Sequence, residues 1–259
     1  MLFDLRGKVA LVAGGAGWLT KPVSRMLTQQ GATVVIGDLS RDRLDQALAE
    51  ITAMVPGARV HGKHFNANDE TAVRDAVDAT VREFGALDVM VNAAYASVGK
   101  LVEEVSADEF AQALRDNLVP AFVLARESAR VMTAGGSMVM FSSMYGQVAP
   151  DPRVYVPPMK PNPIEYGVAK AGIIQMVKYL AAYWGPRGIR VNAVVPGPFP
   201  NPTVQKEEPE FVARLAGRTM LGRIGRQDDV AGCVAFLASD EAAYITGEAI
   251  AINGGWTAW

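Results

Sequence analysis

The chain has 259 residues, half of them hydrophobic and a fifth charged, so it can fill a substantial core. Its formal charge of −2 at pH 7 offers no basic surface to nucleic acid or to an anionic membrane, and no run of about 18 apolar residues predicts a membrane span. One cysteine, Cys233, and two histidines, His61 and His64, give neither an internal disulfide nor a set of metal ligands, so we expect a cytoplasmic protein with no metal, membrane or nucleic-acid partner.

Short β-branched apolar runs alternate with longer stretches of helical spacing along the whole sequence. Strands that alternate with helices connect by right-handed crossovers into a parallel sheet with helices on both faces. We therefore predict an α/β protein with a three-layer, doubly wound fold, forming a single domain over residues 1–259. The predicted strands are Val9–Ala13, Thr33–Gly37, Val60–Phe65, Leu87–Val91, Ser137–Ser142, Ile189–Val194 and Glu248–Ile252.

A glycine-rich segment follows the first predicted strand. Gly14 and Gly17 precede a helical pattern that begins at Lys21, and Asp38 ends the second strand about 20 residues later. This order is typical of a Rossmann fold, in which a helix N-terminus binds a pyrophosphate and an acid accepts hydrogen bonds from a ribose. The alternative is an ordinary turn followed by a capping aspartate.

Asp38 also bears on the choice of cofactor. Its carboxylate would repel a 2′-phosphate, and Leu39 beside it offers no positive charge, which favours NAD over NADP. Arg41 and Lys21 are near enough in the sequence to leave NADP open as the less favoured cofactor.

Two proline-rich stretches interrupt the alternation of strands and helices. Residues 144–165 contain six prolines, too many for a helix or an inner strand, and residues 196–209 contain five. Both follow predicted strands, at the edge of the sheet where open α/β folds bind ligands. We expect residues 144–165 to form an active-site insertion and residues 196–216 a substrate-binding loop or lid. For the insertion, a surface loop or a subunit contact is the alternative.

Tyr166 and Lys170 are four residues apart and so share one face of a predicted helix. A phenol with a pKa near 10 is a poor base at neutral pH, and an adjacent ammonium group stabilises the phenolate. Such a pair can transfer the proton of an alcohol while hydride moves to or from a nicotinamide.

With these motifs in order, the chain resembles the short-chain dehydrogenase/reductase family, in its compact single-domain form. The motifs that carry the resemblance run from residue 7 to about residue 255. They are the glycine loop, Asp38, "NAAY" at 92–95, Asn117, "GSMVMFSS" ending at Ser143, "YGVAK" at 166–170, "RVNAVVPG" and "ITGEAIAINGG".

The resemblance implies four catalytic positions. Tyr166 matches the catalytic acid/base, and Lys170 matches the lysine that lowers the tyrosine pKa and binds the nicotinamide ribose. Ser143 matches the serine that hydrogen-bonds the substrate oxygen, and Asn117 matches the asparagine that holds a water for proton relay. Pro120 fits this last role, because it leaves a carbonyl free and should kink or open the helix beside Asn117. Taken singly, Ser143 could instead satisfy its own turn, and Asn117 could bond locally within its helix.

Cofactor contacts are expected along the carboxyl ends of the strands. The predicted residues are Gly14, Gly17, Trp18, Leu19, Asp38, Leu39, Asn66, Ala67, Asn92, Ala93, Ala94, Tyr166, Lys170, Pro196, Gly197 and Phe199.

Several positions depart from the family pattern. Thr20 replaces the third glycine, with a hydroxyl able to cap the helix or reach a phosphate, and Tyr95 replaces a glycine after the fourth strand. The interval from Ser143 to Tyr166 is longer than usual by about ten residues. Its prolines favour a preformed wall, and its charged and aromatic residues favour a polar substrate.

We therefore expect an NAD-dependent oxidoreductase that interconverts a secondary alcohol and a ketone, on a sugar or polyol-like substrate. Two alternatives remain: an epimerase or dehydratase acting on a sugar nucleotide with bound NAD, and a non-catalytic dinucleotide-binding protein. The family commonly forms homotetramers through paired helices and the C-terminal strand region, which implies a homotetramer or a dimer here. The C-terminal "GGWTAW" would then be able to reach a neighbouring subunit.

Overall fold

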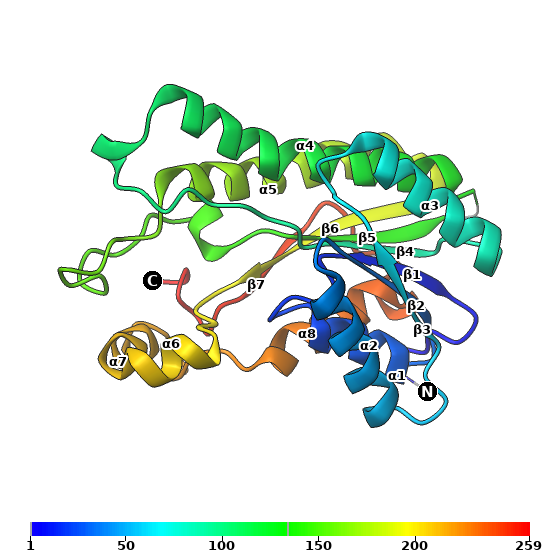
Figure 1. Ribbon diagram of the computed structural model, residues 1–259, viewed down its shortest axis with the longest axis horizontal. Coiled ribbons are helices and arrows are strands. Elements are labelled where there is room, and N and C mark those ends of the chain that lie inside the picture. Colours follow the sequence, from blue (N-terminus) through cyan, green and yellow to red (C-terminus); the bar gives the residue numbers. More distant parts are fainter. Residues whose placement is uncertain (1, 134) are drawn as a thin grey trace.

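A single parallel sheet organises the part of the chain that the computed structural model describes, residues 2–133 and 135–259 (Figure 1). Its seven strands lie in the order β3-β2-β1-β4-β5-β6-β7, and every neighbouring pair is parallel. The reversal of strand order at β1 is the doubly wound arrangement expected from the sequence. The strands are β1 (Val9–Ala13), β2 (Thr33–Asp38), β3 (Val60–His64), β4 (Val89–Asn92), β5 (Gly136–Phe141), β6 (Ile189–Pro196) and β7 (Ala249–Ile252).

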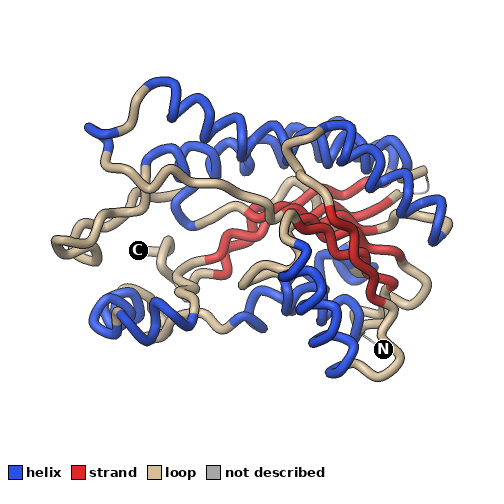
Figure 2. Tube along the Cα trace, in the orientation of Figure 1, coloured by secondary structure: helices blue, strands red, loops and turns tan. Residues whose placement is uncertain are grey.

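Helices cover both faces of the sheet and make three layers (Figure 2). One apolar core lies between the sheet and α1 (Lys21–Gln29), α2 (Arg41–Met54) and α8 (Gln227–Ala238). The other core lies between the sheet and α3 (Glu70–Phe84), α4 (Ala107–Val131) and α5 (Ile164–Trp184). Alternate residues of β1 enter opposite cores, as the period of a strand requires, with Val12 in the first and Leu11 in the second.

The longest helix, α4, begins at the capping box that its sequence predicts. Ser106 accepts a hydrogen bond from the Glu109 backbone, and the Glu109 carboxylate accepts one from the Ser106 backbone. The helix remains continuous past Pro120, so the expected opening of the helix does not occur. Pro120 still lacks the N–H group that would bond the Asp116 carbonyl.

The two proline-rich stretches fold differently. Residues 196–209 are not wholly irregular, because Pro202 and Pro209 occupy the first turns of α6 (Pro202–Glu207) and α7 (Pro209–Gly217). A proline is tolerated in a first turn, where its missing N–H would have no partner anyway. Residues 144–163 contain only the short 3₁₀ helix Met144–Gly146, and α5 begins at Ile164, inside the range predicted for the insertion. Three further 3₁₀ helices are Val102–Glu104, Gly185–Arg187 and Asp240–Ala242.

Within residues 2–133 and 135–259, no helix is long and apolar enough to cross a membrane.

Candidate active site

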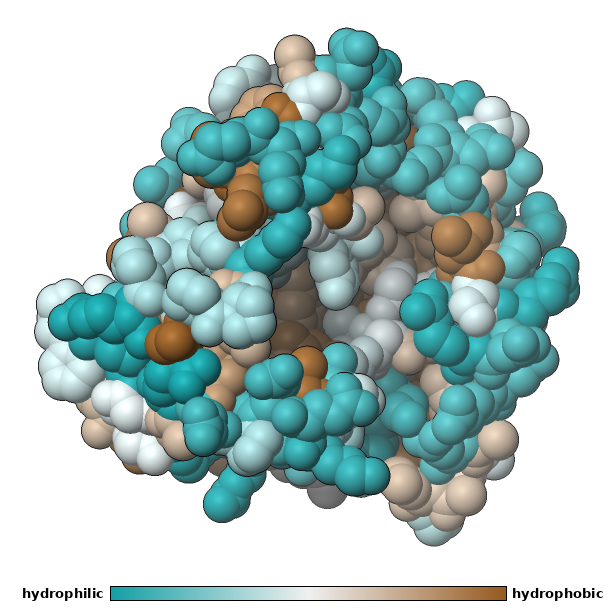
Figure 3. Space-filling view, turned by 60° about the vertical axis from the view of Figure 1, so that its left-hand side comes forward, coloured by the Kyte–Doolittle hydropathy of each residue, from teal (hydrophilic) through white to brown (hydrophobic). Residues whose placement is uncertain are grey.

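A cavity of about 810 Å³ lies at the carboxyl ends of the central strands, between the glycine loop, β4, β5, α5 and the segment after β6. Ser143, Tyr166 and Lys170 line it. Figure 3 shows a hollow with an apolar floor, framed by hydrophilic residues. The structure also places on its wall the predicted cofactor residues Gly14, Gly17, Trp18, Leu19, Asp38, Leu39, Asn66, Ala67, Ala93, Ala94, Pro196, Gly197 and Phe199. Asn92 and Asn117 are buried just behind the wall.

The glycine loop wraps closely around the end of β1. Gly14 has a φ of +70°, and a Cβ there would lie 3.1 Å from the Ala94 backbone nitrogen, so a side chain would be strained and crowded. Thr20 does not cap α1 with its side chain; its hydroxyl instead donates across the loop to the Gly14 carbonyl. Among the described residues, no acceptor is bonded to the backbone N–H groups of Trp18 or Leu19. Two donors beside a helix N-terminus suit a pyrophosphate.

Asp38 stands at the other end of the cavity, at the last position of β2. Its carboxylate is buried, and Oδ1 accepts hydrogen bonds from the Ser40 backbone and from Arg43, at 2.9 and 2.8 Å. Arg43 also lines the cavity, whereas Lys21 forms an ion pair with Glu50. The cation beside Asp38 is therefore Arg43, not Lys21 or Arg41. The first turn of α2 directs the Arg43 side chain back toward the end of β2. That turn follows Ser40, which is a visible capping residue, so the sequence contained a signal for this contact.

Tyr166 and Ser143 meet at the middle of the cavity. Ser143 ends the segment after β5, and its Oγ accepts a hydrogen bond from the Tyr145 backbone at 3.2 Å. Burial raises the pKa of Tyr166 to about 12, although a hydrogen bond from the Ser143 hydroxyl acts in the opposite direction. This differs from the lowered pKa that the family resemblance implies. The tyrosine is a phenol at neutral pH, which is the form that gives a proton.

Lys170 lies one turn further along α5 and is 4% exposed. Its Nζ donates to the Phe141 carbonyl at 3.0 Å and lies over the rings of Tyr166 and Tyr95, at 5.4 and 5.7 Å from their centroids. Burial lowers the pKa of Lys170 to about 8. With no carboxylate beside it among the described residues, the ammonium is held by a carbonyl and two aromatic faces.

Asn117 links α4 to the loop after β4. Its Nδ2 donates to the carbonyls of Ala96 and Ala113, each at 2.8 Å, and its Oδ1 accepts from the Ala96 backbone at 3.3 Å. The contact with Ala113 is the local bond within the helix, while the two contacts with Ala96 fix the loop that carries Tyr95. Asp116, whose carbonyl is freed by Pro120, lines the cavity.

Tyr95, which departs from the family pattern, has its ring beside both Tyr166 and Lys170. It packs edge-on to Tyr166 with ring centroids 6.1 Å apart. The loop behind it is tied to α5 by Glu165, which accepts a hydrogen bond from the Val98 backbone at 3.0 Å. Asn92, at the end of β4, is 4% exposed, and its Oδ1 has no hydrogen-bond partner among the described residues.

The insertion contributes aromatic rather than charged side chains to the cavity. Asp151 pairs with Arg153 at 2.9 Å, and Lys160 pairs with Glu104 at 2.8 Å, all outside the cavity. Its residues on the wall are Met144, Tyr145, Tyr155 and Asn162. These charged residues therefore give no support to a polar substrate in this cavity, because they are paired with one another and with neighbouring loops.

The insertion is fastened to α7 by several contacts. Arg214 donates to the Val154 carbonyl at 2.9 Å, Arg218 Nε lies 2.8 Å from an Asp151 oxygen, and the Tyr155 ring packs on Phe211. Phe211 and Leu215 of α7 also line the cavity. Both fall within residues 196–216, for which the sequence predicted a substrate-binding loop or lid but no helix. The segment's apolar residues at helical spacing were the available signal.

The C-terminal segment packs within its own chain. Trp256 is buried in the apolar cluster under the insertion, and Arg218 lies over the rings of both Trp256 and Trp259. Trp259 remains 67% exposed.

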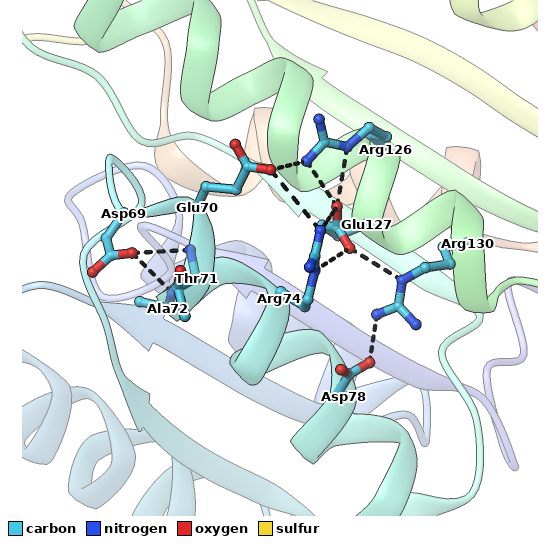
Figure 4. Close-up of polar contacts among 9 residues, drawn as sticks. All are labelled: Asp69, Glu70, Thr71, Ala72, Arg74, Asp78, Arg126, Glu127 and Arg130. Carbon is cyan, nitrogen blue, oxygen red and sulfur yellow. Dashed lines mark hydrogen bonds and ion pairs between the residues drawn. The ribbon is translucent and has the colours of Figure 1, made fainter.

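A second buried charge lies outside the cavity, between α3 and α4. Glu127 is 2% exposed and accepts hydrogen bonds from three arginines, Arg74, Arg126 and Arg130 (Figure 4). All three also contact other carboxylates, because Arg74 and Arg126 both reach Glu70 and Arg130 reaches Asp78. We call these six residues the α3–α4 charge cluster. Burial raises the pKa of Glu127, but the three arginine hydrogen bonds outweigh it and lower the pKa to about 2.

Known proteins with this architecture share nearly the whole chain. A family model described as "Enoyl-(Acyl carrier protein) reductase" matches residues 17–257. A 3-oxoacyl-[acyl-carrier-protein] reductase FabG of Thermotoga maritima is 34% identical, over 97% of this chain and 98% of its own length. A cis-4-hydroxycyclohexanecarboxylate dehydrogenase of Sinomonas cyclohexanicum is also 34% identical, over 97% of each chain. A crystal structure of a putative short-chain alcohol dehydrogenase from Sinorhizobium meliloti 1021 superposes with a TM-score of 0.89 at 29% identity, over 100% of this chain and 99% of that one. Hydroxysteroid and cyclopentanol dehydrogenases also match.

The chain belongs to the short-chain dehydrogenase/reductase family. It is an NAD(P)-dependent oxidoreductase that interconverts a secondary alcohol and a ketone.

Proposed function

We propose that the protein is an NAD-dependent dehydrogenase for a compact, mainly apolar cyclic alcohol, with Tyr166 as the acid/base. The observation that carries this proposal is that one continuous cavity has Asp38 at one end and Tyr166, Ser143 and Lys170 at the other. In this proposal the chain is one domain, residues 144–165 are one wall of the substrate site, and residues 196–216 are its lid.

The residues of the cavity fit a dinucleotide. The strained Gly14 and the free donors of Trp18 and Leu19 would receive the pyrophosphate, and Asp38 would receive the adenosine ribose. Pro196 and Gly197, at the end of β6, would lie along the nicotinamide. When bound, the nicotinamide supplies the acceptor or donor of hydride.

Asp38 supports NAD as the preferred cofactor. The carboxylate would repel a 2′-phosphate, and Arg43 already donates to it, which reduces the positive charge available to a phosphate. NADP is the less favoured alternative.

The protein's own groups handle the proton. In ketone reduction the Tyr166 phenol gives its proton to the substrate oxygen, and the Ser143 hydroxyl holds that oxygen by a hydrogen bond. In alcohol oxidation the same proton returns to the Tyr166 phenolate. Lys170 is proposed to stabilise that phenolate, and Asn117 to hold a water beside it.

The substrate end of the cavity supports a mainly apolar molecule rather than a sugar. Its wall includes Met144, Tyr145, Phe211 and Leu215, while the charges of the insertion face away. A sugar or polyol would leave several hydroxyl groups without partners, and each unpaired polar group costs free energy on burial. The relative that acts on cis-4-hydroxycyclohexanecarboxylate also supports a cyclic alcohol, although that substrate carries a carboxylate.

Self-association is the remaining part of the proposal. α4 exposes Val119 and Phe122, and α5 exposes Tyr179 and Tyr183, whose rings are stacked. Such apolar surface on two neighbouring helices supports burial between subunits, in a homotetramer or a dimer. The mass in solution, from light scattering, decides between these and a monomer.

We also propose that the protein is located in the cytoplasm. Cell fractionation tests this location.

Cofactor binding and turnover are tested in sequence. Titration of NADH and NADPH, followed by fluorescence, should show tighter binding of NADH; failure of both to bind would exclude the proposal. A panel of cycloalkanols and polyols with NAD⁺, followed by NADH absorbance, should then give turnover mainly with the cyclic alcohols. A product of altered stereochemistry or lost water, without net NADH, would favour the epimerase or dehydratase alternative.

Tyr166→Phe removes the proposed proton donor and keeps the ring. We expect kcat to fall by about a thousandfold, because acid–base groups contribute about 10²–10⁴ to such rates. The dissociation constant for NADH should change by less than about twofold. Activity close to that of the unaltered protein would contradict the role given to Tyr166.

A further inference from the structure

Two tyrosine hydroxyls meet at the wall between the cavity and the insertion. Tyr145 comes from the short 3₁₀ helix after Ser143, and Tyr155 comes from the middle of the insertion. Their hydroxyl oxygens are 2.5 Å apart, and both side chains line the cavity that contains the catalytic residues. The insertion therefore brings a phenol to the substrate end from a segment that has no role in holding the cofactor.

The hydrogen bonds around Tyr155 leave one group unused. A phenol has one proton to donate and two lone pairs to accept with. The Tyr145 and Tyr155 hydroxyls share one hydrogen bond, in which either oxygen can be the donor, and we take Tyr145 as the donor. In that arrangement the proton of Tyr155 is free to donate to a ligand.

Asn162 provides a second unused group at the same wall. Its Oδ1 is buried and has no hydrogen-bond partner among the described residues, although the residue lines the cavity. Buried polar atoms are nearly always paired, so an unpaired one beside a cavity indicates a missing partner. The acceptor of Asn162 and the donor of Tyr155 together match a hydroxyl group, which both donates and accepts.

The charges near this wall define the class of ligand further. The charged side chains that line the cavity are Asp38 and Arg43 at the adenosine end, Asp116, and Lys170 at the catalytic centre. Arg153 and Lys160 of the insertion do not line this cavity; Arg153 pairs with Asp151, whereas Lys160 pairs with Glu104 and lines a neighbouring cavity that Tyr155 and Asn162 also border. A carboxylate placed here would lose its hydration without gaining a cation.

We propose that Tyr155 and Asn162 form a specificity subsite that binds a second, neutral oxygen group of the substrate, remote from the reacting carbon. The preferred substrate is then a cyclic hydroxyketone or diol on an apolar frame. This inference rests on the proposed function, since it assumes that the reacting oxygen lies at Ser143 and Tyr166. Tyr155 acts as a specificity-determining residue and takes no part in proton transfer.

The test compares matched ketones. Cyclohexanone and decalone are assayed with NADH, each with and without a hydroxyl group remote from the carbonyl. We expect a kcat/KM about tenfold higher for the hydroxylated member of the better pair, in line with one or two hydrogen bonds. Tyr155→Phe should bring the ratio of kcat/KM for the hydroxylated ketone to kcat/KM for the plain ketone close to one. It should change kcat/KM for the plain ketone by less than about twofold. Tyr145→Phe, which removes one partner of Tyr155, should reduce the ratio by about threefold.

Controls separate a subsite from a general loss of structure. Tyr244→Phe alters a fully exposed tyrosine and should keep the full ratio, and all variants should keep the thermal midpoint within a few degrees. Addition of a carboxylate in place of the hydroxyl should give no increase over cyclohexanone. A preference for the carboxylate, or an equal response to both members of each pair, would overturn the subsite.

Failure of the proposed function gives a different result. If none of the ketones is reduced, the proposed function is refuted on its own. The affinities of the same pairs, measured by calorimetry on the protein with NADH, still decide the subsite. A tighter binding of the hydroxylated member that is lost in Tyr155→Phe would support it, and equal affinities would overturn it.

Discussion

Lys170 and Glu127 are both buried ionisable side chains on the same face of the sheet, yet their surroundings differ sharply. Glu127 has three arginines within hydrogen-bond distance, and those arginines reach further carboxylates. Lys170 has one backbone carbonyl and two aromatic rings. One charge is compensated by opposite charges, and the other is not.

The pKa values express this difference. Glu127 has a pKa lowered to about 2, so folding favours its charged form over the whole physiological range. Lys170 has a pKa lowered to about 8, so folding disfavours its charged form. A group that weakens the fold is retained where function needs it, and such groups cluster at active sites. We therefore interpret the α3–α4 charge cluster as structural and Lys170 as functional, and three experiments test this interpretation.

Lys170→Met gives the largest expected effect, with opposite signs for activity and stability. Activity should fall by about a thousandfold, because the proposed support of the Tyr166 phenolate is lost. The free energy of unfolding at pH 7 should rise by about 2 kcal/mol, since a folded pKa near 8 against 10.5 corresponds to about 3 kcal/mol at most. Chemical denaturation measures this change.

The pH dependence of the free energy of unfolding tests whether the Lys170 charge causes the stability gain of Lys170→Met. The unfolded chain holds the Lys170 proton up to about pH 10.5 and the folded chain only to about pH 8, so stability of the unaltered protein rises over this window. The advantage of Lys170→Met should therefore shrink from pH 8 to 10.5. A variant less stable than the parent at pH 7 would contradict the comparison.

Glu127→Gln should have the opposite effects to Lys170→Met, lowering stability and leaving activity unchanged. It leaves three arginines without their central carboxylate, and we expect the free energy of unfolding to fall by about 2–3 kcal/mol. The arginines are partly exposed and can turn toward water, which limits the loss. Activity at a temperature well below the midpoint should be unchanged. Glu83→Gln, an exposed position on α3, is the matched control and should change stability little. Loss of activity without loss of stability would show that the cluster is functional.

The smallest of the three effects is the pH dependence of turnover. With a Tyr166 pKa near 12, only a small fraction of the tyrosine is phenolate at neutral pH. The rate of alcohol oxidation should therefore rise about tenfold for each pH unit between pH 6 and 8. Above about pH 8, where Lys170 loses its charge, the rate should rise less steeply. Ketone reduction, which uses the phenol, should be nearly flat over the same range. Equal pH profiles in both directions would exclude Tyr166 as the titrating group.

Much of the fold was predictable because each strand is a short apolar run bounded by turn residues. The seven predicted strands are confirmed within one or two residues at each end, and the doubly wound order follows from their alternation with helices. The catalytic residues and the glycine loop could be placed along one edge because parallel strands end there.

Contacts that depend on side-chain direction were not predictable. Arg43 was missed in favour of Arg41, because the first turn of a helix can present either residue to the preceding strand. The charged residues of the insertion favoured a polar substrate, yet composition alone does not say which side chains face inward. Tyr155 and Asn162 lie in a segment without periodicity, where no rule relates neighbouring residues to a common face.

The fastening of the insertion to α7 has a consequence for engineering this enzyme. Tyr155, Val154 and Asp151 hold Phe211, Arg214 and Arg218 in place, although more than 50 residues separate them in the sequence. Neither segment can be exchanged for that of a relative without leaving the other's buried groups unmatched. Segments 144–163 and 196–218 therefore behave as one module, and transplanting substrate preference between relatives requires moving both at once.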